Sequence, residues 1–555
     1  MDQSPFNGAQ RARSGAGPDV DVAVVGAGFS GLYMLHRLRG LGLSARVFER
    51  GSDVGGTWFW NRYPGARCDI ESVDYCYSFS RELLADWVWT ERYATQPEIL
   101  RYLHHVADRF DLRRDIQTST RVTSLRYDEP GNRWLVSTDA GEVVSARHCV
   151  LAVGNLSSQK RPDLAGLDGF RGDWYHTARW PADGVDFDGQ RVGIVGTGST
   201  AIQALPQIAR QAAGVHVFQR TPNYSMPAHN RPLPPTELRE VIRGYGERRR
   251  TAERSDAGVP VAPPQRSALE VGPEERRRMY EAGWQRGGIN SLSYAFTDFF
   301  TDERANFTAQ EFAREKIRQI VRDPAVAEAL CPTHHIGTKR TCVDIGYFDT
   351  YNDDHVRLVD LRRSPITHVT PGGLATTGGE YGLDVIVFAI GFDAITGALL
   401  EIDIRGRGGL SLAEKWSQGP RTYFGLCVAG FPNLFMITGP GSPSVLSNMV
   451  ISIEQHVDWI AGCLGYLEGR GLDRIEASAE AEDAWGRHVS EIADATLYPR
   501  AASWYVGANI PGKPRVFMPY VGGCGNYRRE CEQLADSDYQ GFVLGAGGRS
   551  PGIAT

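Results

Sequence analysis

Two glycine-rich turns are the parts of this sequence whose residue types and spacing point most directly to chemistry. The first, Gly26-x-Gly28-x-x-Gly31, follows a short apolar strand-like run and opens a helical pattern. Glycines at these positions permit a tight turn, close approach of a pyrophosphate and close packing of helix on strand. The next strand-like run ends in Glu49, whose carboxylate is placed to accept hydrogen bonds from a ribose. Strand, turn, helix and terminal acid together predict a dinucleotide site.

The second turn, Gly196-x-Gly198-x-x-Ala201, repeats this arrangement 170 residues later. Its following strand ends not in an acid but in Arg220 and Thr221. A guanidinium attracts a 2′-phosphate and can bind it in a forked geometry, whereas a carboxylate would repel it. The second turn therefore favours NADPH over NADH, and the first dinucleotide is then most economically FAD.

The elements that must position these turns indicate an α/β fold with two Rossmann-like dinucleotide-binding domains, one for FAD and one for NADP, and a helical insertion. Strand-like runs at 149–154 and 383–393 each end in glycine, and we expect the chain to cross between the domains there. The expected order is a disordered N-terminal tail (1–18), the first segment of the FAD-binding domain (19–160), the first segment of the NADP-binding domain (161–230), a helical insertion (231–330), the second segment of the NADP-binding domain (331–383), and the second segment of the FAD-binding domain with a C-terminal mobile loop (384–555). Charged runs within the insertion, such as 247–250, predict helices with solvated faces.

Composition excludes several classes of protein. Sixty basic and 66 acidic residues give a net charge of −6, which lacks the basic excess of a nucleic-acid binder. We find neither an apolar run long enough to span a membrane nor a secretory signal, so we expect no membrane partner. Nine cysteines without a C-x-x-C pair favour a reducing cytoplasm. Without that pair, the chain lacks the redox-active dithiol that a flavin disulfide reductase needs. Cys331, His334 and His335 lack a fourth ligand at matching spacing, so we expect no metal.

The segment between the two turns carries the most specific pattern. Phe170-x-Gly172-x-x-x-His176-x-x-x-Trp180-Pro181 resembles the fingerprint of Baeyer–Villiger monooxygenases, flavoenzymes that insert an oxygen atom beside a ketone carbonyl. Further matches are Gly55-Gly-Thr57-Trp58, Tyr63-Pro-Gly65 with Asp69, and Ile336-Gly-Thr-Lys339-Arg340 with Asp344. The stretches 218–223, 441–448 and 504–514 are most similar to the phenylacetone and steroid monooxygenase group, whereas Ala389-Ile-Gly391 departs from the family's usual A-T-G.

The resemblance implies that NADPH reduces FAD, that NADP⁺ stays bound, and that O₂ then forms a C4a-peroxyflavin. Its anion attacks a ketone to give a tetrahedral peroxy adduct, and the products are esters or lactones. By similarity, Arg340 stabilises the peroxide and the oxyanion, because arginine is not deprotonated in proteins. Asp69, by similarity, holds Arg340 in place.

The resemblance also implies the cofactor contacts. Trp58, Tyr75 and Met449 resemble residues that line the isoalloxazine, with core packing as the rival interpretation, and Trp504 resembles a tryptophan on a loop that closes over NADP⁺. His176 is expected to have a structural or gating role. The expected FAD-site residues are Gly26, Gly28, Phe29, Gly31, Glu49, Thr57, Trp58, Asp69, Tyr75, Val122 and Met449, and the expected NADP-site residues are Gly196, Thr197, Gly198, Ser199, Ala201, Arg220, Thr221, Lys339 and Trp504.

Two other functions remain open at this point: an N- or S-oxygenating flavin monooxygenase, and an NADPH-dependent flavin reductase or redox protein without oxygen insertion. The sequence also leaves open whether the ketone is aryl, cyclic, long-chain or steroidal. We expect a monomer or weak oligomer.

Overall fold

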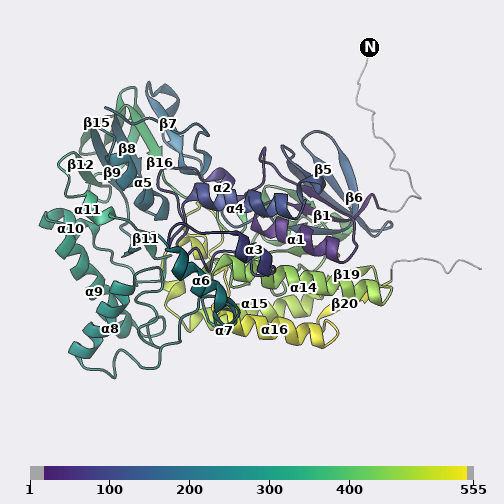
Figure 1. The fold of residues 1–555 in the computed structure, drawn as a ribbon. Coiled ribbons are helices and arrows are strands. Elements are labelled where there is room, and N and C mark those ends of the chain that lie inside the picture. Colours follow the sequence, from purple (N-terminus) through teal and green to yellow (C-terminus); the bar gives the residue numbers. More distant parts are fainter. Residues whose placement is uncertain (1–17, 547–555) are drawn as a thin grey trace, which may run out of the picture.

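The computed structural model describes residues 18–546 (Figure 1). The disordered tail expected over residues 1–18 therefore lies, apart from Pro18, outside the described residues. Two separate sheets dominate the structure, and a group of helices lies beside each of them (Figure 1).

The first sheet contains the first glycine-rich turn. Its order is β17-β4-β5-β6-β1-β2-β3, with β18 pairing to β6; pairing is parallel except that β5 is antiparallel to β4 and β6. Strand β1 ends in a continuous apolar run, Val22–Val25, and these residues are buried. The run is continuous because a central parallel strand is covered on both faces. The strands are β1 (Val20–Val25), β2 (Ala45–Phe48), β3 (Ile116–Gln117), β4 (Val122–Asp128), β5 (Arg133–Thr138), β6 (Val143–Leu151), β17 (Asp403–Arg405) and β18 (Leu434–Met436).

Helices from both ends of the chain cover this sheet. Helix α1 (Phe29–Gly40) packs against α14 (Met449–Gly469), and both contribute to one large apolar core. The N-terminal strand and helix are therefore completed by residues more than 400 positions later. The other helices on this side are α2 (Thr57–Trp60), α3 (Arg81–Asp86), α4 (Gln96–Arg109), α12 (Gly397–Leu400), α13 (Leu412–Lys415), α15 (Ala479–Asp494) and α16 (Cys524–Asp536), beside the antiparallel pair β19 (Arg474–Ala477) and β20 (Phe542–Gly545).

The second sheet contains the second turn and is parallel throughout, in the order β12-β9-β8-β16-β7. Helix α5 (Ser199–Ala209) follows β8 and packs on it. The strands are β7 (Asp173–His176), β8 (Arg191–Val195), β9 (Gly214–Gln219), β12 (Val356–Asp360) and β16 (Val385–Phe388).

Strand β16 corrects the domain boundary expected at residue 384. All four of its residues are buried between β8 and β7 of the second sheet, so the chain leaves that sheet only after Phe388. The pattern of 383–393 predicts a single strand, but the strand ends at Phe388, and in the segment after it Phe392 pairs with Gln159 in an isolated bridge. Three antiparallel strands precede it: β13 (Ile366–Thr370), β14 (Gly373–Thr376) and β15 (Gly379–Gly382).

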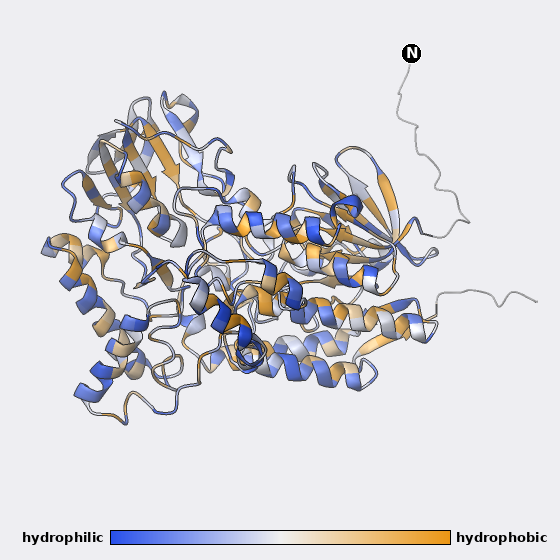
Figure 2. Ribbon diagram, in the orientation of Figure 1, coloured by the Kyte–Doolittle hydropathy of each residue, from blue (hydrophilic) through white to orange (hydrophobic). Residues whose placement is uncertain are grey.

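Helices α6–α10 fill the charged stretch between the halves of the second sheet. Helix α8 is largely hydrophilic in Figure 2, yet Tyr280 and Trp284 on its inner face are buried in a separate core with Phe312 of α9. Asp302 starts α9 by accepting hydrogen bonds from the first backbone N–H groups of the helix. The bounds are α6 (Pro235–Arg243), α7 (Tyr245–Arg254), α8 (Pro273–Arg286), α9 (Glu303–Ile320), α10 (Pro324–Leu330) and α11 (Tyr347–Thr350), with the short parallel pair β10 (Ser225–Pro227) and β11 (Cys342–Asp344).

Within residues 18–546, we find no helix that is both long enough and apolar enough to cross a bilayer.

Candidate active site

The first glycine-rich turn is so tight that side chains would not fit. Gly26 has φ +106°, and a Cβ there would lie 2.5 Å from the carbonyl oxygen of Ala152. A Cβ on Gly31 would lie 1.8 Å from the carbonyl oxygen of Gly26, so helix and strand can approach only without one. Helix α1 begins at Phe29, and among the described residues no side chain caps its first N–H groups. These free donors form a site for an anion such as a pyrophosphate.

Glu49 lies at the end of β2, where the sequence predicted a ribose acceptor. Its side chain is buried, and its two carboxylate oxygens accept hydrogen bonds from the backbone N–H groups of Ala27 (2.8 Å) and Gly51 (2.6 Å). These bonds fix the carboxylate beside the turn. Each oxygen keeps a further lone pair, so Glu49 can still accept from a ligand hydroxyl.

A large cavity joins this turn to the second unit. Its volume is about 330 Å³, which lies within the roughly 300–1000 Å³ of a small-molecule site, and it has an open side. The predicted site residues that line it are Gly26, Gly28, Phe29, Glu49, Thr57, Trp58, Asp69, Tyr75, Val122, Ser199, Arg340, Met449 and Trp504.

The remaining predicted residues lie elsewhere. Gly31 packs behind the first turn, and the others belong to the second turn and its surroundings: Gly196, Thr197, Gly198, Ala201, Arg220, Thr221 and Lys339. The structure thus brings the predicted FAD residues other than Gly31 together around one cavity, which Ser199 at the start of α5 and Trp504 also line.

One wall of the cavity is aromatic. Trp58 Nε1 donates a hydrogen bond to the hydroxyl of Tyr75 at 3.2 Å, and the two rings meet edge to face. The Tyr75 ring also lies 5.1 Å from that of Phe29. Burial raises the pKa of the Tyr75 phenol well above its ordinary value, so the hydroxyl stays neutral. This wall offers flat apolar surface to a planar ring.

Arg340 and Asp69 form the charged centre of the cavity. Arg340 Nε and Nη2 donate to the two oxygens of Asp69 at 2.7 and 2.8 Å, and Nη1 donates to the carbonyl oxygen of Val445 at 2.6 Å. Such a forked pair fixes the guanidinium in orientation as well as in position. Residues 271 positions apart in the sequence therefore act as one unit at the cavity wall.

The charge on Arg340 is permanent. Burial opposes that charge, but the attraction of Asp69 and the hydrogen bonds to it outweigh burial, and the pKa of the guanidinium lies above its ordinary value. A fixed cation at the wall of a cavity can stabilise negative charge that develops on an oxygen of a bound substrate.

The segment that carries Asp69 is fixed by contact with the second unit. The Tyr63 hydroxyl donates to Gln203 Oε1 at 2.8 Å, and the Gln203 amide donates to the carbonyl oxygen of Arg67 at 3.1 Å. A Cβ on Gly65 would lie 2.3 Å from the carbonyl oxygen of Gln203, so only glycine permits this contact with α5. The Tyr63-Pro-Gly65 turn therefore positions Asp69 relative to both sheets.

The second turn repeats the geometry of the first. Gly196 has φ +118°, and a Cβ there would lie 2.3 Å from the carbonyl oxygen of Ala389. The contact involves the backbone of residue 389, so the departure from A-T-G at 389–391 leaves it intact. Thr197 Oγ1 donates to the carbonyl oxygen of Thr221 at 2.7 Å, which ties this turn to the end of β9.

Two basic residues beside the second turn have no acidic partner in the described part of the chain. Neither Arg220 nor Lys339 forms an ion pair with a carboxylate of residues 18–546. Burial first, and then repulsion from Arg220, lower the pKa of Lys339. Two cations that approach each other without a counter-charge form a site for an anion.

His176, the histidine of the fingerprint, lies away from the cavity. It ends β7 beside Phe388, and its Nδ1 accepts a hydrogen bond from the backbone N–H of Ala178 at 3.0 Å. Burial lowers the pKa of its ring to about 4, so the ring is neutral at neutral pH. Its contacts are those of a residue that shapes the segment between the two sheets.

Trp504 lines the cavity from a loop that is attached to the crossover segment after β16. Its ring lies 4.3 Å from that of Tyr505. Asn509 Nδ2 donates to the carbonyl oxygen of Phe392 at 2.7 Å, and Lys513 pairs with Asp393. These contacts describe a loop held against the cavity.

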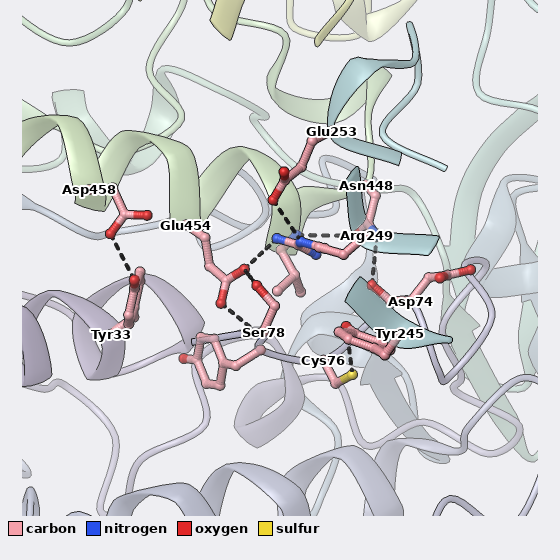
Figure 3. A network of polar contacts seen from close by, with 12 residues as sticks. Tyr33, Asp74, Cys76, Ser78, Tyr245, Arg249, Glu253, Asn448, Glu454 and Asp458 are labelled. Atoms are coloured by element: carbon pink, nitrogen blue, oxygen red, sulfur yellow. Dashed lines mark hydrogen bonds and ion pairs between the residues drawn. The ribbon is translucent and has the colours of Figure 1, made fainter. Parts of the chain in front are cut away.

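A buried network of polar contacts, which the sequence did not predict, lies beside residues of the cavity wall (Figure 3). Arg249 of α7 pairs with Glu454 of α14, and Glu454 also accepts hydrogen bonds from the backbone N–H and the hydroxyl of Ser78 at 2.7 and 2.6 Å. Asn448 Nδ2 donates to the carbonyl oxygen of Asp74 at 2.7 Å. The network thus holds the residues that precede Met449 and Tyr75 in the cavity wall.

The prediction of a solvated helix face for the charged run 247–250 is wrong at one position. Arg249 shares a buried helix face with Tyr245 and Ala252. Helical spacing from those two apolar residues is the signal that could have identified it.

Comparison with known proteins places this geometry in a family. A family model described as pyridine nucleotide-disulphide oxidoreductase matches residues 23–251. A Baeyer-Villiger monooxygenase from Pseudooceanicola batsensis is 43% identical over 95% of this chain and 96% of its own length. The chain belongs to the Baeyer–Villiger monooxygenase family.

Further relatives and solved structures are similar to this chain over nearly its full length. The acetone monooxygenase (methyl acetate-forming) of Gordonia sp. is 41% identical over 95% of this chain and 99% of its own. An oxidized steroid monooxygenase bound to NADP has a TM-score of 0.91 at 55% identity, covering 95% of this chain and 99% of that one. A phenazine N-monooxygenase from Lysobacter antibioticus is 42% identical over 94% of this chain and 97% of its own length. The nine cysteines, all among the described residues, are unpaired and buried.

Proposed function

We propose that this protein is an NADPH- and O₂-dependent flavoprotein monooxygenase that converts ketones to esters or lactones. The observation that carries the proposal is the forked Arg340–Asp69 pair at the wall of a cavity that runs from one dinucleotide turn toward the other. The balanced reaction is ketone, O₂, NADPH and a proton giving ester, water and NADP⁺. One carbon–carbon bond beside the carbonyl breaks, and two carbon–oxygen bonds hold the inserted atom.

FAD fits the first turn and its cavity. The turn admits no side chains at Gly26 and Gly31, the first N–H groups of α1 are free, and Glu49 keeps lone pairs for a ribose. The aromatic wall of Trp58 and Tyr75 would lie against the ring system, with Thr57, Val122 and Met449 as further contacts. We assign the first sheet and its helices to FAD, and the second sheet to NADP.

NADPH fits the second turn. Arg220, Thr221 and Lys339 would hold the 2′-phosphate, and Trp504 would lie over the nicotinamide side of the cavity. Solved relatives of the chain contain NADP, including the steroid monooxygenase described above.

When bound, the two cofactors supply the electrons that reduce O₂ and allow one of its atoms to be transferred. Arg340 would donate hydrogen bonds to the oxyanion that develops on the ketone oxygen. Asp69 would keep Arg340 in orientation throughout, and Val445 would limit its movement through the backbone carbonyl. Removing one donor of this kind typically costs about 3–4 kcal/mol of transition-state stabilisation.

The experiment is turnover of a panel of ketones of graded size by purified enzyme with FAD, NADPH and O₂, with products identified by mass. We expect a product one oxygen atom heavier than the ketone. The Arg340→Ala variant should still consume NADPH to reduce FAD, but its rate of ester formation should fall by about 10²- to 10³-fold. Ester yield near that of the unchanged enzyme would remove Arg340 from this role.

Nitrogen oxygenation is the second candidate, because the phenazine N-monooxygenase relative is as similar as the ketone enzymes. An N-oxide from a heteroaromatic amine, without ester from any ketone of the panel, would favour it.

We also propose that the protein works in the cytoplasm and as a monomer or weak oligomer. The nine unpaired cysteines support a reducing environment. Size-exclusion chromatography with light scattering tests the oligomeric state.

A further inference from the structure

A third basic side chain, Lys160, lies in the surroundings of the second turn. Its side chain is half-buried. Burial first, and then repulsion from Arg220, lower the pKa of Lys160, as they do for Lys339. Arg220 is thus close enough to repel both lysines.

The backbone explains how Lys160 reaches this place. Its N–H donates to the carbonyl oxygen of Gly391 at 3.2 Å, and the preceding Gln159 pairs with Phe392 in an antiparallel bridge. Gly391 follows β16, so Lys160 lies at the carboxyl end of the second sheet. Arg220 follows β9 at the same end. Between β9 and β16 lies β8, which carries the glycine-rich turn.

No described residue neutralises these charges. Among residues 18–546, no carboxylate forms an ion pair with Lys160, Arg220 or Lys339. Gathering three cations costs Coulomb energy, and partial burial of the two lysines adds to that cost. A bound dianion would offset more of both costs than a single negative charge would.

We propose that Lys160 is a third cation of the 2′-phosphate site and a determinant of the preference for NADPH over NADH. The inference rests on the proposed function, which places the 2′-phosphate at Arg220, Thr221 and Lys339. The phosphate is a dianion near neutral pH and accepts charge-assisted hydrogen bonds from several donors at once. Lys160 comes from a segment outside the strand–turn–helix unit, which explains why the pattern of that unit does not reveal it.

The test is equilibrium titration of the FAD-loaded enzyme with NADP⁺, with NAD⁺ and with adenosine 2′,5′-bisphosphate, which carries the 2′-phosphate without the nicotinamide. The variant is Lys160→Gln. The matched control is Arg161→Gln, which removes the same charge from an exposed neighbour that forms no ion pair with residues 18–546. FAD content and thermal unfolding are measured on both variants.

For Lys160→Gln we expect Kd for NADP⁺ and for the bisphosphate to rise about tenfold, because a hydrogen bond to a charged group contributes at least that factor. Kd for NAD⁺ should change less than twofold, and Arg161→Gln should change none of the three by more than that. An equal loss for NAD⁺ and NADP⁺, or no loss for either, overturns the inference.

A parallel titration of Arg220→Ala separates this inference from the proposed function. If Arg220→Ala weakens NADP⁺ selectively and Lys160→Gln does not, the 2′-phosphate site stands and Lys160 does not belong to it. If Arg220→Ala leaves the ratio of the two dissociation constants unchanged, the phosphate assignment itself fails.

Discussion

Replacing Asp69 by alanine should disable oxygen transfer through Arg340. In the structure, Arg340 has three hydrogen-bond anchors: two to Asp69, at 2.7 and 2.8 Å, and one to Val445, at 2.6 Å. Asp69→Ala removes two of them and the only carboxylate that pairs with this guanidinium within residues 18–546. The half-buried cation then keeps the Val445 carbonyl and its contact with Tyr505 but no carboxylate, and it can turn toward solvent.

The magnitude follows from the loss of a fixed donor. Losing one preorganised donor to an oxyanion costs about 2.7–4 kcal/mol, or roughly 10²- to 10³-fold in kcat. Asp69→Ala should therefore lower kcat for ester formation by about a hundredfold. Asp69→Asn keeps one acceptor oxygen for Arg340 but no charge, so its loss should be nearer tenfold, about 1.4 kcal/mol.

The assay is ester formed per NADPH consumed, measured for Asp69→Ala, Arg340→Ala and the double variant. Because Asp69 acts through Arg340, the double variant should be no slower than Arg340→Ala alone, which gives a coupling energy close to the whole Asp69 effect. FAD content should remain at the level of the unchanged enzyme. A further hundredfold loss on adding Asp69→Ala to Arg340→Ala would refute the reasoning, because Asp69 would then act independently.

Two further predictions concern stability. Arg249→Met should lower the free energy of unfolding by about 3–5 kcal/mol, because it leaves Glu454 buried without its partner, whereas Arg249→Met with Glu454→Met should regain most of that loss. Urea unfolding measures the free energy of unfolding of both variants. A loss below about 1 kcal/mol for Arg249→Met would mean that the Arg249–Glu454 pair contributes no more than a solvent-exposed ion pair. Burial lowers the pKa of His148 in the folded protein to about 3, against an ordinary value near 6.5. The unfolded chain then binds the extra proton, so stability falls as pH drops below about 6.5, by about 2 kcal/mol at pH 5. His148→Leu should reduce the difference in unfolding temperature between pH 7 and pH 5, and the same change at exposed His368 should not; an equal effect at both positions would contradict this assignment.

The sequence allowed much of the fold to be predicted because its strongest signals are local. Each glycine-rich turn lies between a strand and a helix that are contiguous in the chain, and a Cβ at Gly26 or Gly196 would collide with backbone. The family resemblance, confirmed by relatives across nearly the full chain, linked Arg340 to Asp69 although 271 residues separate them.

Two features were not predicted because they depend on contacts with residues that are distant in the sequence. The apolar run 385–388 is equally suited to either sheet, and only its pairing with β8 and β7 decides which one it joins. Arg249 belongs to a charged run like many solvated ones, and its burial follows from the position of Glu454 on a helix two hundred residues later. No property of the local sequence specifies those partners.

The paired crossover between the two sheets has a consequence for how the halves of the molecule move. Residues 158–160 and 391–393 run antiparallel at one place, joined by the Gln159–Phe392 bridge and by hydrogen bonds on either side. Two paired chain segments between two sheets form a hinge. Such a hinge permits rotation of one sheet relative to the other about one axis and opposes rotation about the other axes. The loop that carries Trp504 is attached to the same place through Phe392 and Asp393. Rotation of the part built around the second sheet would therefore displace the loop that carries Trp504, and with it one wall of the cavity.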